Sequence, residues 1–428
     1  MTPEIRSIVR RLLNLSATLF LVFGIVNLLT VIQFLDDSRL VDVLPYHITQ
    51  TFSAVLLHLS ILSGLLGGGL YLINVEQRNH TLNIRWLQYT VTAWIVFAIV
   101  STILGVFGFI GADGGFMLVL PPFLEILRLL IVAAILMLLL PTIGSPVSLI
   151  WFAGMVVSLA GSLLGLLTSS NPLTMSVLAA LAEGLVLNVG YLLTVIALSF
   201  WLMSRFSNLR HAWFNHRIYL AAGVLALAGT LISLSPLHAL ATSPLINMLG
   251  NLSIILIPGA FLLFAIFSYS ALGERKINVM LTARWYILGL HLLLIGVGLL
   301  GALNATPIAN AWTQGTQLTF LQQHITAIAY MVILLGMMNQ AAAEMRRSQR
   351  ITSVLPFWLF VTGVLIGALS LAAAGLVQVY LERVLTVGYL ETQVYLAPLY
   401  VFWVLGMATL ALAALVFVFE YTRRVSRI

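Results

Sequence analysis

The chain contains no cysteine among its 428 residues. Without thiols it can form neither disulfides nor thiolate metal sites, and it can hold neither iron–sulfur clusters nor covalently attached c-type haem. Any metal cofactor must therefore be bound by histidine, methionine or carboxylate side chains. The chain has eight histidines, and each is a candidate ligand.

Charge is also scarce, since only 8% of the residues are charged and 61% are hydrophobic. A soluble domain of this length could not cover its surface with so few polar groups. The apolar runs follow one another along the chain, and most are long enough to cross a hydrocarbon core of roughly 30 Å, which takes about 20 helical residues. We therefore predict a single polytopic domain over residues 1–428, embedded in a lipid bilayer.

The fold class expected is an all-α membrane protein with about twelve transmembrane helices. The predicted spans are 12–34, 45–72, 87–110, 117–140, 147–168, 174–203, 217–236, 243–272, 285–304, 317–343, 353–380 and 393–419. With this even number, both termini lie on one side of the membrane.

Basic residues are distributed unevenly between the two sides. All of them except Arg39, Arg128 and Arg383 fall on the side that carries the termini. Cytoplasmic loops of membrane proteins are enriched in Lys and Arg, so both termini are predicted to be cytoplasmic. Because this rule explains the positive net charge, no nucleic-acid partner is expected.

Two histidines lie in the outer parts of inward-running spans, at depths that could match. His47 follows Pro45 at the start of the second span, and His324 lies in the tenth. Two facing imidazoles can bind the iron of one low-spin haem from opposite sides. The alternative is that both histidines only pack helices and bond to carbonyl groups.

These motifs resemble the large catalytic subunit of the haem-copper oxidases, especially the C-type (cbb-type) oxidases and the related nitric oxide reductases. In that family a histidine shortly after a proline in the second helix binds the low-spin haem, as His47 would. In the tenth helix two histidines flank one residue, and residues 324–330 resemble the stretch that begins with the second of them. The resemblance makes His324 the other low-spin ligand and puts Gln322 where the ligand of the high-spin haem should be.

The family's copper ligands are also replaced under this resemblance. Residues 189–194 resemble the segment after the copper-binding histidine of the sixth helix, which places that ligand at Val186. Residues 235–242 resemble the region of the histidine pair, with Leu237 in place of the first histidine and only His238 left. A lone imidazole holds copper weakly. Glu183, about one turn before Val186, is an alternative metal ligand, although a structural role is the simpler explanation.

Other polar residues inside the spans require a partner, because burying them in a membrane is costly. Glu125 and Arg128 lie three residues apart on one helix face and can form an ion pair. Arg128 could instead contact a haem propionate, together with Arg39 or Arg383. A second haem between His58 and His291 is a further alternative.

The leading hypothesis is a b-type cytochrome subunit of a prokaryotic cytoplasmic membrane. It would carry electrons through one low-spin haem b with two histidine ligands, and copper and the high-spin haem would be absent. Its partners would be other subunits of a respiratory complex, above all a cytochrome or redox subunit on the outer face, and a quinone is a further candidate. The alternatives are an active oxidase or nitric oxide reductase with unusual ligands, and a haem-free transporter or structural subunit.

Overall fold

The computed structural model describes residues 2–33, 35, 46–76, 82–107, 120–167, 171–206, 211–234, 244–272, 281–346 and 351–425. Inside these helices some side chains, including that of His47, are not described. The α-helices are α1 (Pro3–Ile32), α2 (Tyr46–Glu76), α3 (Ile84–Val106), α4 (Pro122–Leu139), α5 (Pro146–Gly165), α6 (Pro172–Gly184), α7 (Leu192–Phe206), α8 (His211–Leu234), α9 (Pro244–Leu272), α10 (Leu281–Leu293), α11 (Gly301–Ala305), α12 (Pro307–Thr313), α13 (Gln317–Arg346), α14 (Leu355–Val379) and α15 (Tyr389–Val425).

Three π-helical segments interrupt or extend these helices, and one 3₁₀ turn follows α4. They are the 3₁₀ turn η1 (Leu140–Thr142) and the π-helices η2 (Leu185–Tyr191), η5 (Leu294–Leu300) and η6 (Tyr380–Val384). Segment η2 joins α6 to α7, and η5 joins α10 to α11, so each of these pairs forms one continuous span.

Within the described part of the chain, ten helices are long and apolar enough to cross a membrane. Helices α8 and α9 contain shorter described apolar stretches, Tyr219–Thr230 and Leu256–Ile266. Every predicted span coincides with a helical segment, and the prediction of an all-α membrane bundle is confirmed. Twelve crossings and the cytoplasmic position of the termini stay predictions.

Local sequence signals account for several helix starts. Proline occupies the first turn of α1, α4 and α5, where its missing N–H costs no intrahelical bond. The hydroxyl of Ser145 accepts a hydrogen bond from the Ser148 backbone N–H at 3.0 Å, and the Ser148 hydroxyl accepts one from the Ser145 backbone N–H. This capping box satisfies two backbone donors at the start of α5.

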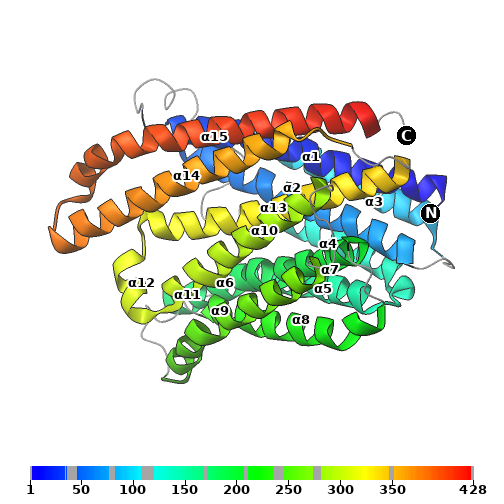
Figure 1. The fold of residues 1–428 in the computed structure, drawn as a ribbon, viewed down its shortest axis with the longest axis horizontal. Helices are drawn as coiled ribbons and strands as arrows, with labels where there is room; N and C mark the ends of the chain where they lie inside the picture. Colours follow the sequence, from blue (N-terminus) through cyan, green and yellow to red (C-terminus); the bar gives the residue numbers. More distant parts are fainter. Residues whose placement is uncertain are drawn as a thin grey trace.

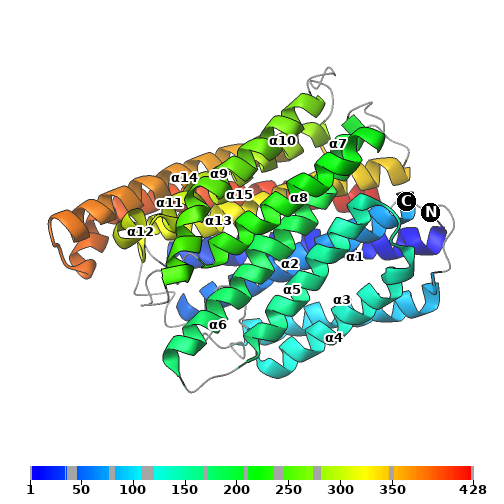
Figure 2. The ribbon, with the colours of Figure 1, turned by 90° about the horizontal axis from the view of Figure 1, so that it is seen from below.

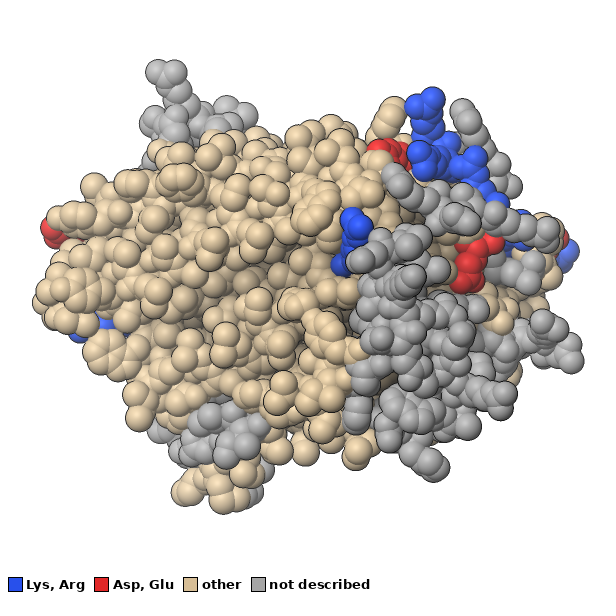
Figure 3. Space-filling view, viewed as in Figure 1, with Lys and Arg blue, Asp and Glu red and all other residues tan. Residues whose placement is uncertain are grey.

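The helices run along the long axis of the molecule, and both termini lie at the same end (Figure 1). The view from below shows α3, α4 and α5 along one flank of the bundle and α9 and α10 along the other (Figure 2). On the face in Figure 3, most Lys and Arg side chains gather at the end that holds the termini, and the broad middle carries almost none. Such an uncharged belt between polar ends fits a bilayer-spanning orientation.

Helices α2 and α13 form the most deeply buried part of the bundle. The Ser60 hydroxyl lies 3.5 Å from the Met331 sulfur, and the Tyr71 hydroxyl donates a hydrogen bond to the Glu344 carboxylate at 2.6 Å. Because both residue numbers increase together, the two helices run in the same direction. These contacts fix how far one helix is shifted along the other.

Candidate functional site

His324 lies in the second turn of α13, among aromatic side chains. Its side chain is buried, with the residue 8% exposed. Its ring lies 3.9 Å, between centroids, from the ring of Phe320, which in turn meets Trp403 of α15 edge-on at 5.5 Å. The imidazole therefore lies in largely apolar surroundings, where a ligand to iron would be shielded from water.

Helix α15 places a sulfur atom at the level of His324. The Gln317 amide donates a hydrogen bond to the Tyr400 hydroxyl at 3.0 Å, and Phe320 contacts Trp403, so partners on α13 and α15 differ by 83 in number. The same shift pairs His324 with Met407. Sequence reasoning did not find Met407, because an apolar helix gives no signal that distinguishes one methionine from its neighbours.

A small apolar cavity of about 20 Å³ lies between α1, α13, α14 and α15. Met407 lines it together with Ile328, which is one turn beyond His324 on the same face of α13. The Asn27 amide of α1 also lines it and donates a hydrogen bond to the Met407 sulfur at 3.2 Å. The lining of the cavity thus contains the Met407 sulfur and the Asn27 amide, and its other side chains are hydrocarbon.

The backbone of His47 lies in the first turn of α2, and its side chain is outside the described residues. At the Ser60–Met331 contact, the residue numbers of the neighbouring positions on α2 and α13 differ by 271. The same difference places Ser53 at the level of His324. His47 precedes Ser53 by six residues, or about 9 Å along the helix axis. The pairing of His47 with His324 stays a prediction, because the side chain of His47 lies outside the described residues.

Gln322, expected at the high-spin ligand position, takes part in a contact between helices. Its side-chain oxygen accepts a hydrogen bond from the Asn304 amide of α11. The Asn304 oxygen in turn accepts one from the Thr313 hydroxyl of α12 at 3.1 Å. The Gln322 amide is therefore engaged in holding α11 and α12 against α13.

Val186, expected at the copper position, lies in η2 and packs against α5. A Cβ atom added at Gly161 of α5 would lie 3.0 Å from a methyl group of Val186. The backbone oxygen next in the chain, that of Leu187, accepts a hydrogen bond from the Tyr330 hydroxyl of α13 at 2.9 Å. Val186 thus packs against α5, and the backbone of η2 is bonded to α13.

The remaining expected copper and propionate residues are placed as follows. Leu237, His238 and Arg39 lie outside the described residues. Arg383 lies in η6, where its guanidinium donates a 3.3 Å hydrogen bond to the backbone oxygen of Gln314. Among the described residues, no three histidine or carboxylate side chains are grouped so as to hold a metal ion.

A second site contains five polar side chains from four segments. We call it the polar cluster: His58 of α2, Glu125 and Arg128 of α4, Ser162 of α5 and Tyr191 of η2. The Arg128 guanidinium forms the predicted ion pair with Glu125, and its Nε donates to the Glu125 carboxylate at 2.9 Å. It also lies 2.8 Å from His58 Nε2 and donates to the Ser162 hydroxyl at 2.5 Å.

The arrangement of the polar cluster assigns the hydrogen on the His58 ring. A guanidinium only donates hydrogen bonds, so His58 Nε2 accepts from Arg128 and the ring hydrogen lies on Nδ1. Nδ1 is 3.0 Å from the Tyr191 hydroxyl, to which it donates. Only the Glu125–Arg128 spacing was visible in the sequence, because the other partners come from distant segments.

His58 and His291, the alternative ligands of a second haem, have separate partners. His58 belongs to the polar cluster. His291 of α10 lies 2.8 Å from the Tyr269 hydroxyl of α9 and 2.8 Å from the backbone oxygen of Ile287. The described contacts do not bring these two histidines together.

Comparison with known proteins gives a local similarity. No protein-family model matches the chain. A stretch of 99 residues is 33% identical to a nitric oxide reductase from Stutzerimonas stutzeri, and it covers 21% of this chain and 21% of that protein. The likeness is to the haem-copper oxidase superfamily. The similar stretch spans about a fifth of the relative's length. It supports a distant link between the two proteins, and the activity of the relative is not transferred to this chain.

Proposed function

We propose that this chain is a b-type cytochrome subunit of a membrane electron-transfer complex, with one low-spin haem on His324 and without an oxygen-reducing centre. The observation that carries the proposal is the buried imidazole of His324, which packs against the Phe320 ring. The helical bundle and the local likeness to a nitric oxide reductase support it.

The donor atoms near this level fit a haem iron. Histidine nitrogen and methionine sulfur are both established axial ligands, and the pair raises the haem potential relative to two histidines. Either Met407 or His47 would hold the iron together with His324.

A bound haem would supply one-electron transfer, and the chain's own residues would hold and insulate it. Phe320 covers the imidazole, Trp403 packs against Phe320, and Ile328 and Phe360 present hydrocarbon to the cavity. His324 lies near the start of α13, toward the end of the bundle opposite the termini. A partner cytochrome, a redox subunit or a quinone would exchange electrons at that end.

The test is haem quantification with optical spectra of the purified chain and of three variants, His324→Ala, Met407→Leu and His47→Ala. We expect one b-type haem per chain, lost in His324→Ala. The second ligand is the residue whose variant converts the low-spin spectrum to a high-spin one. A colourless wild-type protein with intact helix content would overturn the proposal.

A second candidate function is a structural membrane subunit without haem. The observation that favours it is the small size of the apolar cavity between α1, α13, α14 and α15, which is about 20 Å³. It predicts a colourless protein. An active oxidase or reductase would instead contain a second haem and copper or non-haem iron, so metal analysis of the same sample separates all three.

A further inference from the structure

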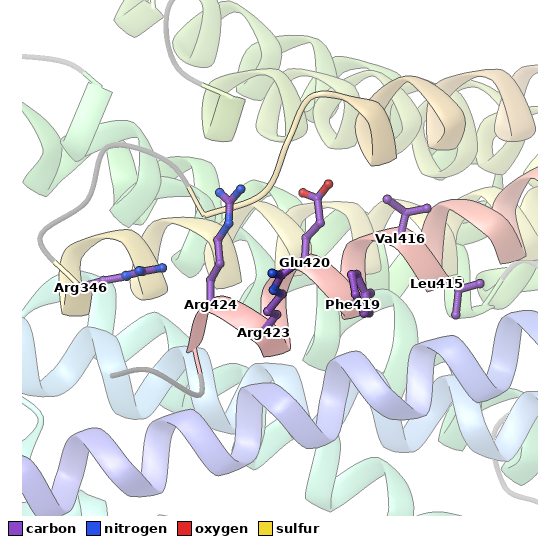
Figure 4. Close-up of a pocket in the computed structure, with 7 residues that line it drawn as sticks. All are labelled: Arg346, Leu415, Val416, Phe419, Glu420, Arg423 and Arg424. Carbon is purple, nitrogen blue, oxygen red and sulfur yellow. The ribbon is translucent and has the colours of Figure 1, made fainter.

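A pocket of about 720 Å³ opens at the end of the bundle that holds the termini, between the last turns of α13 and α15. Arg346 approaches it from α13, and the other lining residues come from α15 (Figure 4). They are Leu415, Val416, Phe419, Glu420, Arg423 and Arg424. A volume in this range is typical of pockets that hold small molecules or headgroups.

The pocket carries an excess of positive charge. Its one carboxylate is that of Glu420. This carboxylate accepts hydrogen bonds from the Ser353 hydroxyl at 2.6 Å and from the Ser353 backbone N–H. The Arg424 guanidinium donates one hydrogen bond, to the backbone oxygen of Ile351 at 2.7 Å, out of five N–H groups. Arg346 and Arg423 are exposed. Three guanidinium groups thus line a space that suits an oxyanion.

An apolar stripe leads directly into this pocket along α15. Phe402, Leu405, Leu412, Leu415 and Phe419 are each about half exposed or more, with 50% for Leu415 and 62% for Phe419. Their spacing of three, four or seven residues puts them on one face of the helix. Exposed apolar side chains on a membrane-spanning helix face lipid chains, so the stripe and the charged pocket together match an amphipathic molecule.

We infer that this pocket binds an anionic phospholipid, whose phosphate contacts Arg346, Arg423 and Arg424 and whose acyl chain lies along the α15 stripe. Guanidinium groups bind phosphate oxygens in a bidentate way, and basic pockets between helices at the cytoplasmic surface suit anionic headgroups. The apolar lining favours a phospholipid over free phosphate, because contacts with Leu415 and Phe419 stabilise a bound acyl chain and contribute nothing to the binding of inorganic phosphate. The inference goes beyond the proposed function and does not depend on haem.

The experiment measures the retention of phosphatidylglycerol by the full-length chain in phosphatidylcholine nanodiscs, with native mass spectrometry as the readout. The double variant Arg346→Gln/Arg423→Gln should bind phosphatidylglycerol about thirtyfold more weakly. Arg85→Gln is the matched control, since Arg85 is an exposed arginine at the start of α3 outside the pocket, and it should bind as the wild type does.

A second variant keeps the charge and alters the stripe. Leu415→Ser/Phe419→Ser should also weaken phosphatidylglycerol binding while leaving the arginines in place. Unchanged binding in the arginine variant, with its helix content intact, would overturn the inference. Inorganic phosphate that displaces phosphatidylglycerol at comparable concentration would likewise overturn it, because the site would then recognise the phosphate alone.

Discussion

The polar cluster and the surroundings of His324 are both buried sites built around histidine, and they differ in how their donors are used. In the polar cluster, a guanidinium, a carboxylate, an imidazole and two hydroxyls bond to one another across four segments. Around His324, the ring of Phe320 lies against the imidazole, and Trp403 packs against Phe320. The first site is a network of polar groups that joins helices, whereas the second is a single imidazole among apolar side chains.

The largest effect should come from breaking the ion pair in the polar cluster. Arg128→Met leaves the Glu125 carboxylate buried at 4% exposure. An uncompensated buried charge costs about 3–5 kcal/mol, so thermal unfolding in detergent should occur at a much lower temperature. The double variant Glu125→Leu/Arg128→Leu should recover most of the loss. A single variant as stable as the wild type would show that the cluster does not hold the helices together.

The direct comparison is between His58→Leu and His324→Leu, which remove the two central imidazoles. His58→Leu takes the acceptor from the Arg128 guanidinium and the donor from the Tyr191 hydroxyl, at a cost of about 1–3 kcal/mol. With haem extracted from all samples, His324→Leu puts an aliphatic group among apolar neighbours and should cost clearly less stability than His58→Leu. Haem content should follow the opposite order and fall only in His324→Leu. Equal losses of stability would remove the distinction between the sites.

The smallest effect concerns the hydroxyl of Tyr191. Tyr191→Phe removes the acceptor for His58 Nδ1, and a side-chain hydrogen bond between membrane helices contributes about 0.6 kcal/mol on average. Tyr421→Phe is the control, because the buried Tyr421 hydroxyl has no hydrogen-bond partner within the described ranges. A larger loss in the control than in Tyr191→Phe would contradict the assigned network.

The sequence predicted the positions of the helices well, because in a membrane the length and hydropathy of each apolar run decide where a helix lies. The segment containing η2 illustrates this, since residues 174–203 are predicted as one span and form one. Hydropathy says nothing about a change from α- to π-helical bonding inside a span, so the π-helix could not be predicted.

Side-chain positions were predicted only where local geometry determined them. The Glu125–Arg128 pair follows from a three-residue spacing on one helix. The level of His47 relative to His324 depends instead on how α2 slides along α13. The two helices begin at matching levels, Tyr46 beside Gln317, yet His47 is the second residue of its helix and His324 the eighth of its own. The pairing of the two imidazoles therefore stays a prediction.

The π-helical hydrogen bonding of η2 determines which side chains of α7 face which neighbours. A π-turn bonds each residue to the fifth one along instead of the fourth, so η2 behaves as an α-helix that has absorbed one extra residue. If all of Leu185–Tyr191 were wound as an ordinary α-helix, α7 would be turned by about 100° against α6. Tyr191 would then leave His58, and the buried face of α7 would turn toward other neighbours. This short segment therefore sets the rotation of α7 about its own axis relative to α6. The side chains of α7 keep their partners only while the π-helical bonding persists.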